Sequence, residues 1–95
     1  MPAVCRIGDA DIPHCSGMTR AAGSTNVFVN GIGISRQGDP NTTHKKPPFI
    51  PPCPSHAVGI KVGSLKVKVN GKGCGRVGDA TCTAVAQGSN NVFAG

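Results

Sequence analysis

The residues of this chain best suited to chemistry are its three histidines and five cysteines. His44, Cys53 and His56 lie in the segment HKKPPFIPPCPSH, residues 44 to 56, where five of the thirteen positions are proline. Because proline fixes φ and removes a hydrogen-bond donor, this segment can be neither a helix nor a central strand. Imidazole and thiolate are zinc ligands, so a stiff loop that carries them predicts a metal site. A Cys–His nucleophile pair, Cys53 with His56, is the alternative. The chain has no Glu and no spare acid near that pair, so we expect no enzymatic activity and no small-molecule substrate.

The chain contains an internal repeat. The stretch GSTNVFVNGIGISRQGD, residues 23–39, returns as GSLKVKVNGKGCGRVGD at residues 63–79. A third copy starts at GSNNVF, residues 88–93, shortly before the chain ends. The sequence therefore predicts three related units.

The missing half of the third unit lies at the other end of the chain. Residues 92–95 followed by residues 1–6 align with residues 27–36 without a gap. A repeat that closes on itself in this way predicts a ring with pseudo-threefold symmetry and neighbouring chain ends. The expected units are residues 6–35, 36–75 and 76–95, the last completed by residues 1–5.

Each unit is predicted to be a β-hairpin. In LKVKV, residues 65–69, apolar and charged residues alternate with the period of a half-buried strand. Asn30-Gly31 and Asn70-Gly71 supply the dipeptide that is favoured where a two-residue turn needs positive φ at both positions. No stretch has sustained helical periodicity. We therefore expect one all-β domain over residues 1–95, a small cone of three β-hairpin repeats without significant helix.

Three loops of different length connect these units, and they hold the candidate metal ligands. The loops are residues 10–22, 40–62 and 80–87. All three histidines fall in the first two loops, and Cys82 is the only Cys or His in the third. If each loop sends at least one ligand to a shared centre, one thiolate and three imidazoles complete a tetrahedral zinc shell at the apex. The predicted ligands are His14, His44, His56 and Cys82.

The other cysteines are either rival candidates for the fourth zinc ligand or are expected to have packing roles only. Cys53 lies three residues before His56 and is the main rival of Cys82, whereas Cys15 directly follows His14 and is too close to be an easy partner. By the internal alignment Cys74 replaces Ile34 and Val4, so it is predicted to be a small apolar filler. Cys5 takes the place of Ser35 and Gly75, a position that requires only a small residue.

Composition indicates a small domain with a thin core. The chain has 95 residues, 14 of them Gly and only three of them aromatic, and such a core usually needs support from a metal, disulfides or oligomerisation. Five cysteines at irregular spacing form a poor disulfide framework, which favours reduced thiols in the cytosol. There is no apolar run of about 18 residues and no leader-like start, so we expect neither a transmembrane span nor a signal peptide.

The charges give two further expectations. The net charge is +6, but the Lys and Arg are scattered and no aromatic platform accompanies them, so we expect no nucleic-acid binding. The nearest cluster, Lys61, Lys66, Lys68 and Lys72, is interpreted as a solvated strand face. Arg-x-Gly-Asp occurs three times, beginning at residues 6, 36 and 76. This recurrence favours a structural role, in which the Asp caps the turn into each loop and the Arg pairs with an Asp.

The combination of recurring GS..V.VNG and R.GD elements with CPSHA at residues 53–57 and GDATC at residues 78–82 resembles the PAAR-repeat family, over essentially the whole chain. The resemblance implies a cone of β-hairpins with one structural zinc ion near its point, held by three His and one Cys. It also implies a flat triangular base, docked with one copy per trimer on the C-terminal end of a trimeric β-helical spike protein. The first loop, with its extra thiol, and the long proline-rich second loop depart from the family pattern.

The resemblance further implies the structural tip of a membrane-piercing spike in a contractile injection machine, in transient contact with the target cell envelope. We expect a bare tip of a phage tail baseplate, a virion protein made in the host cytoplasm, because the chain starts and stops at the ring closure. The alternative is a stand-alone tip of a bacterial type VI secretion system, cytoplasmic and then secreted. A small zinc-binding nucleic-acid module is a third, less favoured function.

Overall fold

The computed structural model describes residues 2–13, 17–42, 44–45 and 55–95, with the backbone alone for residues 44–45 and 55–56. Its regular elements are short antiparallel strand pairs, and the described part of the chain contains no helix. Among the described residues there is therefore no helix long and apolar enough to cross a membrane. The predicted all-β class is confirmed. The strands of the described residues are β1 (Phe28–Val29), β2 (Ile32–Gly33), β3 (His44–Lys45), β4 (Ser55–His56), β5 (Lys68–Val69) and β6 (Lys72–Gly73).

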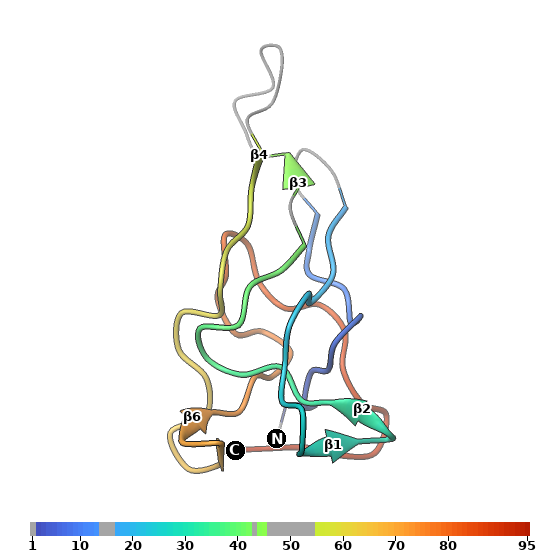
Figure 1. Ribbon diagram of the computed structural model, residues 1–95, viewed down its shortest axis with the longest axis vertical. Helices are drawn as coiled ribbons and strands as arrows, with labels where there is room; N and C mark the ends of the chain where they lie inside the picture. Colours follow the sequence, from blue (N-terminus) through green and yellow to red (C-terminus); the bar gives the residue numbers. More distant parts are fainter. Residues whose placement is uncertain (1, 14–16, 43, 46–54) are drawn as a thin grey trace.

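Strands β1 and β2 form one hairpin, and β5 and β6 form another with the same register. Asn30 and Gly31 turn the first hairpin at φ of 56° and 76°, and Asn70 and Gly71 turn the second at 54° and 80°. These are the positive values that a two-residue turn requires, and Asn and Gly adopt them at little cost. The predicted turns are confirmed. Figure 1 places β1, β2 and β6 at the same end of the molecule as both chain termini, an end that we call the base.

The strand predicted at residues 65–69 is shorter than its alternating pattern indicates. Only Lys68 and Val69 belong to β5, and Val69 is buried whereas Leu65 is exposed. The physical reason is local, because the hydroxyl of Ser64 accepts hydrogen bonds from the backbone N–H groups of Lys66 and Val67. This side-chain turn holds the backbone away from a ladder until residue 68.

A closed ring of backbone hydrogen bonds joins the three units. Ser35 N–H donates to the carbonyl of Cys5 at 3.1 Å, Cys5 N–H to that of Gly75 at 3.0 Å, and Gly75 N–H to that of Ser35 at 2.9 Å. We call these three residues the inner ring. They are the aligned positions at which the sequence predicts small residues. The reason is spatial, because a Cβ at Gly75 would lie 2.6 Å from both the Cys5 sulfur and the Ser35 carbonyl oxygen.

The two ends of the chain pair with each other, as the end-to-start alignment predicts. Ala3 bridges Phe93 in antiparallel fashion, Val4 N–H donates to the Val92 carbonyl at 3.0 Å, and Ala94 N–H donates to the Pro2 carbonyl at 3.0 Å. N and C lie side by side at the base (Figure 1). The N-terminal segment therefore supplies backbone partners that the C-terminal segment lacks.

The three Arg-x-Gly-Asp elements have the predicted structural role. In each, the Asp carboxylate accepts a hydrogen bond of 2.8 Å from the backbone N–H of the Arg and also binds its guanidinium. The intervening glycines, Gly8, Gly38 and Gly78, have φ between 88° and 94°, a region that disfavours any side chain. Charge and backbone geometry thus fix the same turn at the start of every loop.

The core is thin, as the composition predicts. Two small clusters of buried apolar residues lie near the base and around the inner ring. Cys74 packs in the first cluster with Ile34 and Val4, the residues with which it aligns, so its predicted role as an apolar filler is confirmed. The buried members are Val4, Val29, Ile34, Val69, Cys74 and Ala94 in the first cluster and Cys5, Ile60 and Val85 in the second.

Candidate metal centre

The three loops that carry the predicted ligands meet through their backbones. Ile12 of the first loop donates to the carbonyl of Ala84 in the third loop at 2.9 Å. Thr42 of the second loop donates to the carbonyl of Thr19 in the first loop at 2.8 Å. Lys61 of the second loop donates to the carbonyl of Ala80 in the third at 2.9 Å. Segments far apart in the sequence are thereby held at the side of the molecule opposite the base (Figure 1).

Two of the predicted ligands lie on one strand pair. In the antiparallel β3–β4 pair, His44 is directly opposite His56 and Lys45 is opposite Ser55. Directly opposed residues are the nearest backbone neighbours across an antiparallel pair. The backbone register is therefore compatible with a shared metal ion.

Cys82, the predicted ligand of the third loop, lies where all three loops converge. Its half-buried sulfur is 3.7 Å from the Asn41 side-chain nitrogen, which donates a hydrogen bond to it, and 3.9 Å from the Met18 sulfur. Asn41 belongs to the second loop and Met18 to the first. Cysteine binds metal through its sulfur, as the thiolate.

His14, Cys15 and Cys53 lie outside the described residues, and for His44 and His56 the backbone alone is described. Within the part of the chain whose side chains are described, no three His, Cys, Asp or Glu residues gather into a group that could hold a metal. The set His14, His44, His56 and Cys82, with Cys53 as the rival, stays a prediction, and its thiolate and imidazole groups are of the kinds that zinc binds.

A buried ion pair lies beneath Cys82. Arg20 and Asp11, both completely shielded from solvent at their side chains, are joined by a 2.7 Å contact between Nη2 and Oδ2. The same carboxylate oxygen accepts a hydrogen bond from Asn41 at 3.0 Å, and Arg20 also donates to the Asp39 carbonyl at 3.0 Å. Asn41 accepts in turn from the backbone of Val58 at 2.8 Å. This network joins the first and second loops and reaches Cys82 through Asn41.

Sequence reasoning did not single out this network. The signal was nevertheless present, because the chain has four Arg and four Asp, and three pairs are used by the Arg-x-Gly-Asp elements. Arg20 and Asp11 are the pair that remains. Two buried opposite charges are stable only together, since either one alone would be left unpaired away from water.

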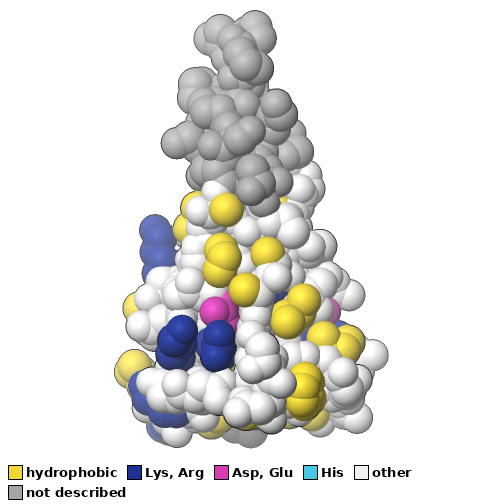
Figure 2. Space-filling view, viewed as in Figure 1, with side chains coloured by type: hydrophobic (Ala, Val, Ile, Leu, Met, Phe, Trp, Pro, Cys, Tyr) yellow, Lys and Arg dark blue, Asp and Glu magenta, His cyan; other side chains and the backbone are white. Residues whose placement is uncertain are grey.

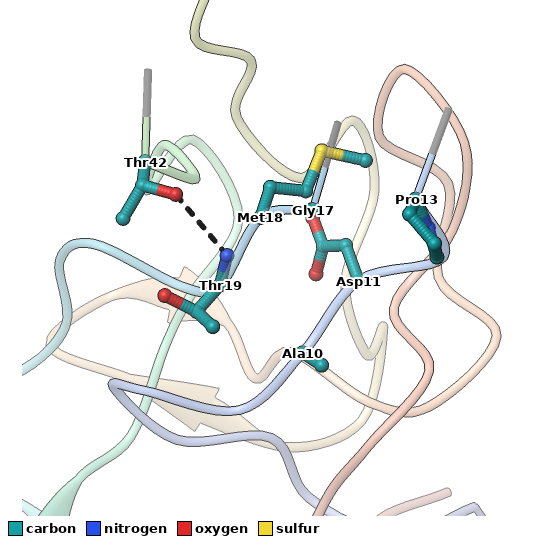
Figure 3. A pocket seen from close by; sticks show the side chains of 7 residues that line it. All are labelled: Ala10, Asp11, Pro13, Gly17, Met18, Thr19 and Thr42. Atoms are coloured by element: carbon teal, nitrogen blue, oxygen red, sulfur yellow. Dashed lines mark hydrogen bonds between the residues drawn. The ribbon is translucent and has the colours of Figure 1, made fainter. Parts of the chain in front are cut away.

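A hollow opens beside this network (Figure 3). Asp11 and Met18 line it together with residues of the same loop and Thr42, whose hydroxyl accepts a 3.2 Å hydrogen bond from the Thr19 backbone. The wall is mostly apolar, and one oxygen of Asp11 has no hydrogen-bond partner. The lining residues are Ala10, Asp11, Pro13, Gly17, Met18, Thr19 and Thr42.

Cys5 and Cys74, which lie in the two buried apolar clusters, are poor candidates for a reactive role. Burial raises the pKa of the Cys5 thiol to about 12, and burial also raises the pKa of Cys74. A thiol with a raised pKa is a poor nucleophile at neutral pH. Both side chains therefore act as packing groups, as their alignment predicts.

The chain matches no known protein-family model, and no curated protein is similar to it at a significant level.

Proposed function

We propose that this protein is the structural, non-catalytic tip of a membrane-piercing spike in a contractile injection machine. In this proposal the three repeats form a cone of hairpins, and its base docks on the C-terminal end of a trimeric β-helical spike protein of a phage tail baseplate. The observation that carries the proposal is the inner ring, in which three backbone hydrogen bonds of 2.9–3.1 Å join aligned positions of the three units.

The inner ring supports a one-to-three stoichiometry. A single chain with three related faces can place one face against each subunit of a true trimer, so a symmetric partner binds one copy. The surrounding bonds repeat in the same way: Ile7, Gln37 and Val77, which are aligned positions, donate at 2.8–2.9 Å to the carbonyls of Gly33, Gly73 and Ala3. Three segments of different sequence therefore form the same backbone hydrogen bond at equivalent positions.

Exposed apolar side chains near the base support docking at that end. Phe28 of β1 is 56% exposed, and Phe93, at the aligned position in the third unit, is 48% exposed. Ile32 of β2 is also exposed. A partner that covers these side chains would remove them from water, and strand edges at the base could continue its β-helix by main-chain pairing.

At the opposite end, the proposal assigns one structural zinc ion to the converging loops. His44 and His56 stand in register, and Cys82 contacts residues of both other loops. When bound, zinc supplies folding energy to loops that a thin core of Val and Ala does not hold. With four protein ligands no position is left for an activating water, so the ion is structural and not catalytic.

The same geometry would suit the alternative, a tip of a type VI secretion system. The neighbouring genes distinguish the two functions: genes for a tail baseplate favour the phage tail, and genes for secretion components favour the secretion system. The direct test mixes this chain with the C-terminal β-helix of the spike encoded beside it and measures the mass of the complex. We expect one copy of this chain per spike trimer. Three copies per trimer, or no complex, would overturn the proposal.

A further inference from the structure

The base carries one exposed polar side chain at each junction between two units. These side chains are Asn26, Lys66 and Asn91, which occupy the same position of the repeat. Each lies two residues after the buried serine of a Gly-Ser element. We call these three residues the outer ring.

Two members of the outer ring bind the neighbouring unit through their side-chain oxygen. Asn70 Nδ2, in the turn between β5 and β6, donates to Asn26 Oδ1 at 2.9 Å. Asn30 Nδ2, in the turn between β1 and β2, donates to Asn91 Oδ1 at 3.0 Å. In each case the hydroxyl of the serine two residues earlier donates to the same oxygen at 3.0 Å. Both oxygens therefore face groups of this chain, and the two turns place the outer ring at the base (Figure 1).

The nitrogen atoms of the same two amides are left for a partner. Neither Asn26 Nδ2 nor Asn91 Nδ2 donates a hydrogen bond to any described residue. A planar amide carries its nitrogen and its oxygen on opposite branches, so Nδ2 points away from the groups that Oδ1 contacts, and it has two N–H donors. Each of these exposed side chains thus offers hydrogen-bond donors to the surroundings.

Lys66 provides the corresponding donor at the third junction. The residue aligned with the turn asparagines is here Gly95, which has no side chain, and the Ser64 hydroxyl donates directly to the Gly95 carbonyl. Lys66 is therefore not needed to hold this turn. Its ammonium group carries three N–H donors and a positive charge, and it forms no ion pair with a described residue. All three positions of the outer ring consequently present N–H donors.

Positive charge accumulates around Lys66. All four Asp of the chain are ion-paired to its four Arg at 2.7–2.8 Å, so the net charge of +6 equals the number of lysines. Lys68 and Lys72 are exposed beside Lys66 on the β5–β6 hairpin. Figure 2 shows Lys and Arg side chains gathered at the lower left, on the side where Figure 1 places β6. A partner that covers this part of the base must therefore supply negative charge.

We propose that the outer ring binds three carboxylates, one from an acidic side chain of each subunit of the trimeric spike. This inference rests on the proposed function and names the chemistry of its partner. A symmetric trimer presents the same group three times, and N–H donors stand at all three aligned positions of this chain. An ionised carboxylate only accepts hydrogen bonds, and its bonds from N–H groups are charge-assisted.

A carboxylate matches the outer ring better than a neutral acceptor does. A carbonyl oxygen could accept from Asn26 and Asn91, but it would leave the ammonium group of Lys66 without a counter-charge. A carboxylate satisfies the amides and the ammonium alike. Lys68 stands where the other two units have an exposed Phe, and its aliphatic stem can cover the same apolar contact while its charge stays at the edge.

The complex with the spike encoded beside this chain provides the first test. Three double variants each lower the net charge by two: Lys66→Gln/Lys68→Gln, Asn26→Asp/Asn91→Asp and Lys45→Gln/Lys46→Gln. The Asp variant keeps an oxygen for each neighbouring turn but replaces the free N–H donors with anionic oxygen. We expect the first two variants to bind the spike about tenfold more weakly, mainly through slower association at low salt. The third variant changes β3 and the residue after it, away from the base, and we expect it to bind like the unchanged chain.

A second test needs no spike. Hexaglutamate with blocked ends is titrated into the isotope-labelled chain and followed by nuclear magnetic resonance, with hexaglutamine as the control peptide. We expect chemical-shift changes concentrated on the outer ring and its sequence neighbours, absent with hexaglutamine and lost as salt is raised. Changes concentrated on residues 44–46 instead, or equal changes with the two peptides, would overturn the inference.

The two tests separate this inference from the spike-tip proposal. A one-to-three complex that is weakened equally by all three double variants, or by none, would overturn the carboxylate contact and leave the spike tip in place. If no complex forms but hexaglutamate shifts the outer ring, the spike-tip proposal fails and the carboxylate-binding surface stands. Thermal unfolding checks that the variants are folded. Lys66→Gln alone, which breaks no ion pair among the described residues, carries the test if the Asp variant unfolds.

Discussion

Ser35 donates its backbone N–H to the carbonyl oxygen of Cys5 at 3.1 Å, although thirty residues separate the two along the chain. Gly75 completes this inner ring, and its hydrogen atoms occupy space that no side chain could share. A Cβ there would meet the Cys5 sulfur, the Ser35 carbonyl oxygen and an Ile60 methyl group at 2.6–2.7 Å. The three units can approach one another this closely only because each contributes a small residue.

The first prediction concerns this close approach. Gly75→Ala is expected to lower the free energy of unfolding by about 3 kcal/mol, because the added methyl group must displace the Ser35 carbonyl and the Cys5 and Ile60 side chains. Gly17→Ala is the matched control, since no atom of the described residues lies within 4 Å of a Cβ at that position and its φ is not in the positive region. Its stability should be unchanged or slightly higher. Denaturant unfolding compares the two, and equal effects would contradict the ring geometry.

The pairing of the chain ends gives a second prediction. Gly95 and Met1 align with Asn30 and Gly31, the turn of the first hairpin. A circular permutant that joins residue 95 to residue 1 directly, with Met1→Gly, and opens between Asn70 and Gly71 is expected to fold with a melting temperature close to that of the linear chain.

Deletion of residues 1–6 should by contrast abolish cooperative unfolding. It removes the backbone partners of Val92 and Ala94 and one member of the inner ring. Thermal melts monitored by circular dichroism measure both variants. An unchanged melting temperature after the deletion, or an unfolded permutant, would show that the terminal pairing does not hold the domain together.

The buried ion pair gives a third prediction. Arg20→Met leaves the Asp11 carboxylate buried without its counter-ion and should cost about 3–5 kcal/mol of stability. Arg36→Met breaks a pair of similar length whose Arg is 16% exposed, and solvent should limit the loss to about 1 kcal/mol. Asp11→Asn in the Arg20→Met background removes the stranded charge and should recover part of the stability. Equal losses for the two single variants would count against the importance of burial.

Most of the base could be predicted from the sequence, because its constraints are local or repeated. Asn-Gly turns, Arg-x-Gly-Asp turns and the small residues of the inner ring each occur at aligned positions, so the repeat alone identifies them. The length of β5 could not be predicted, since the Ser64 hydroxyl competes for the N–H groups of Lys66 and Val67. Arg20 and Asp11 were missed because they lie outside the repeat and their pairing is a tertiary contact. The position of Cys82 beside Met18 and Asn41 likewise depends on how three unequal loops fold over one another.

The raised pKa of Cys5 gives a fourth prediction, on pH dependence. The thiol has a pKa of about 12 in the folded protein against 9.0 when unperturbed, mainly because burial disfavours the thiolate. The folded state therefore keeps a proton that the unfolded state loses, and stability is fully present below pH 9.0 and declines as the pH rises toward about 12. Within this window the slope from this group approaches about 1.4 kcal/mol per pH unit.

Cys5→Ser places at this position the residue that the aligned Ser35 already carries, and it removes the titrating thiol. Subtracting the pH–stability curve of the variant from that of the unchanged chain isolates the contribution of Cys5, since the lysines titrate equally in both. We expect the difference to be constant below about pH 9 and to fall above it. A flat difference would mean that Cys5 ionises as readily in the folded as in the unfolded protein.

The last prediction concerns the metal. Cys82 is the predicted thiolate ligand, and its sulfur accepts a hydrogen bond from Asn41 at the point where the three loops meet. A structural zinc at this point contributes binding energy to folding, so its removal by a chelator should lower the melting temperature of the loops more than that of the base. Elemental analysis of the purified chain should find about one zinc per molecule, strongly reduced in Cys82→Ser and largely retained in Cys53→Ser. Cobalt in place of zinc adds a second readout, because a thiolate-to-metal absorption band should be present in the unchanged chain and in Cys53→Ser and absent from Cys82→Ser. The reverse pattern would make Cys53 the ligand, and a chain without metal in every case would end the metal hypothesis while leaving the hydrogen-bonded ring at the base as it is.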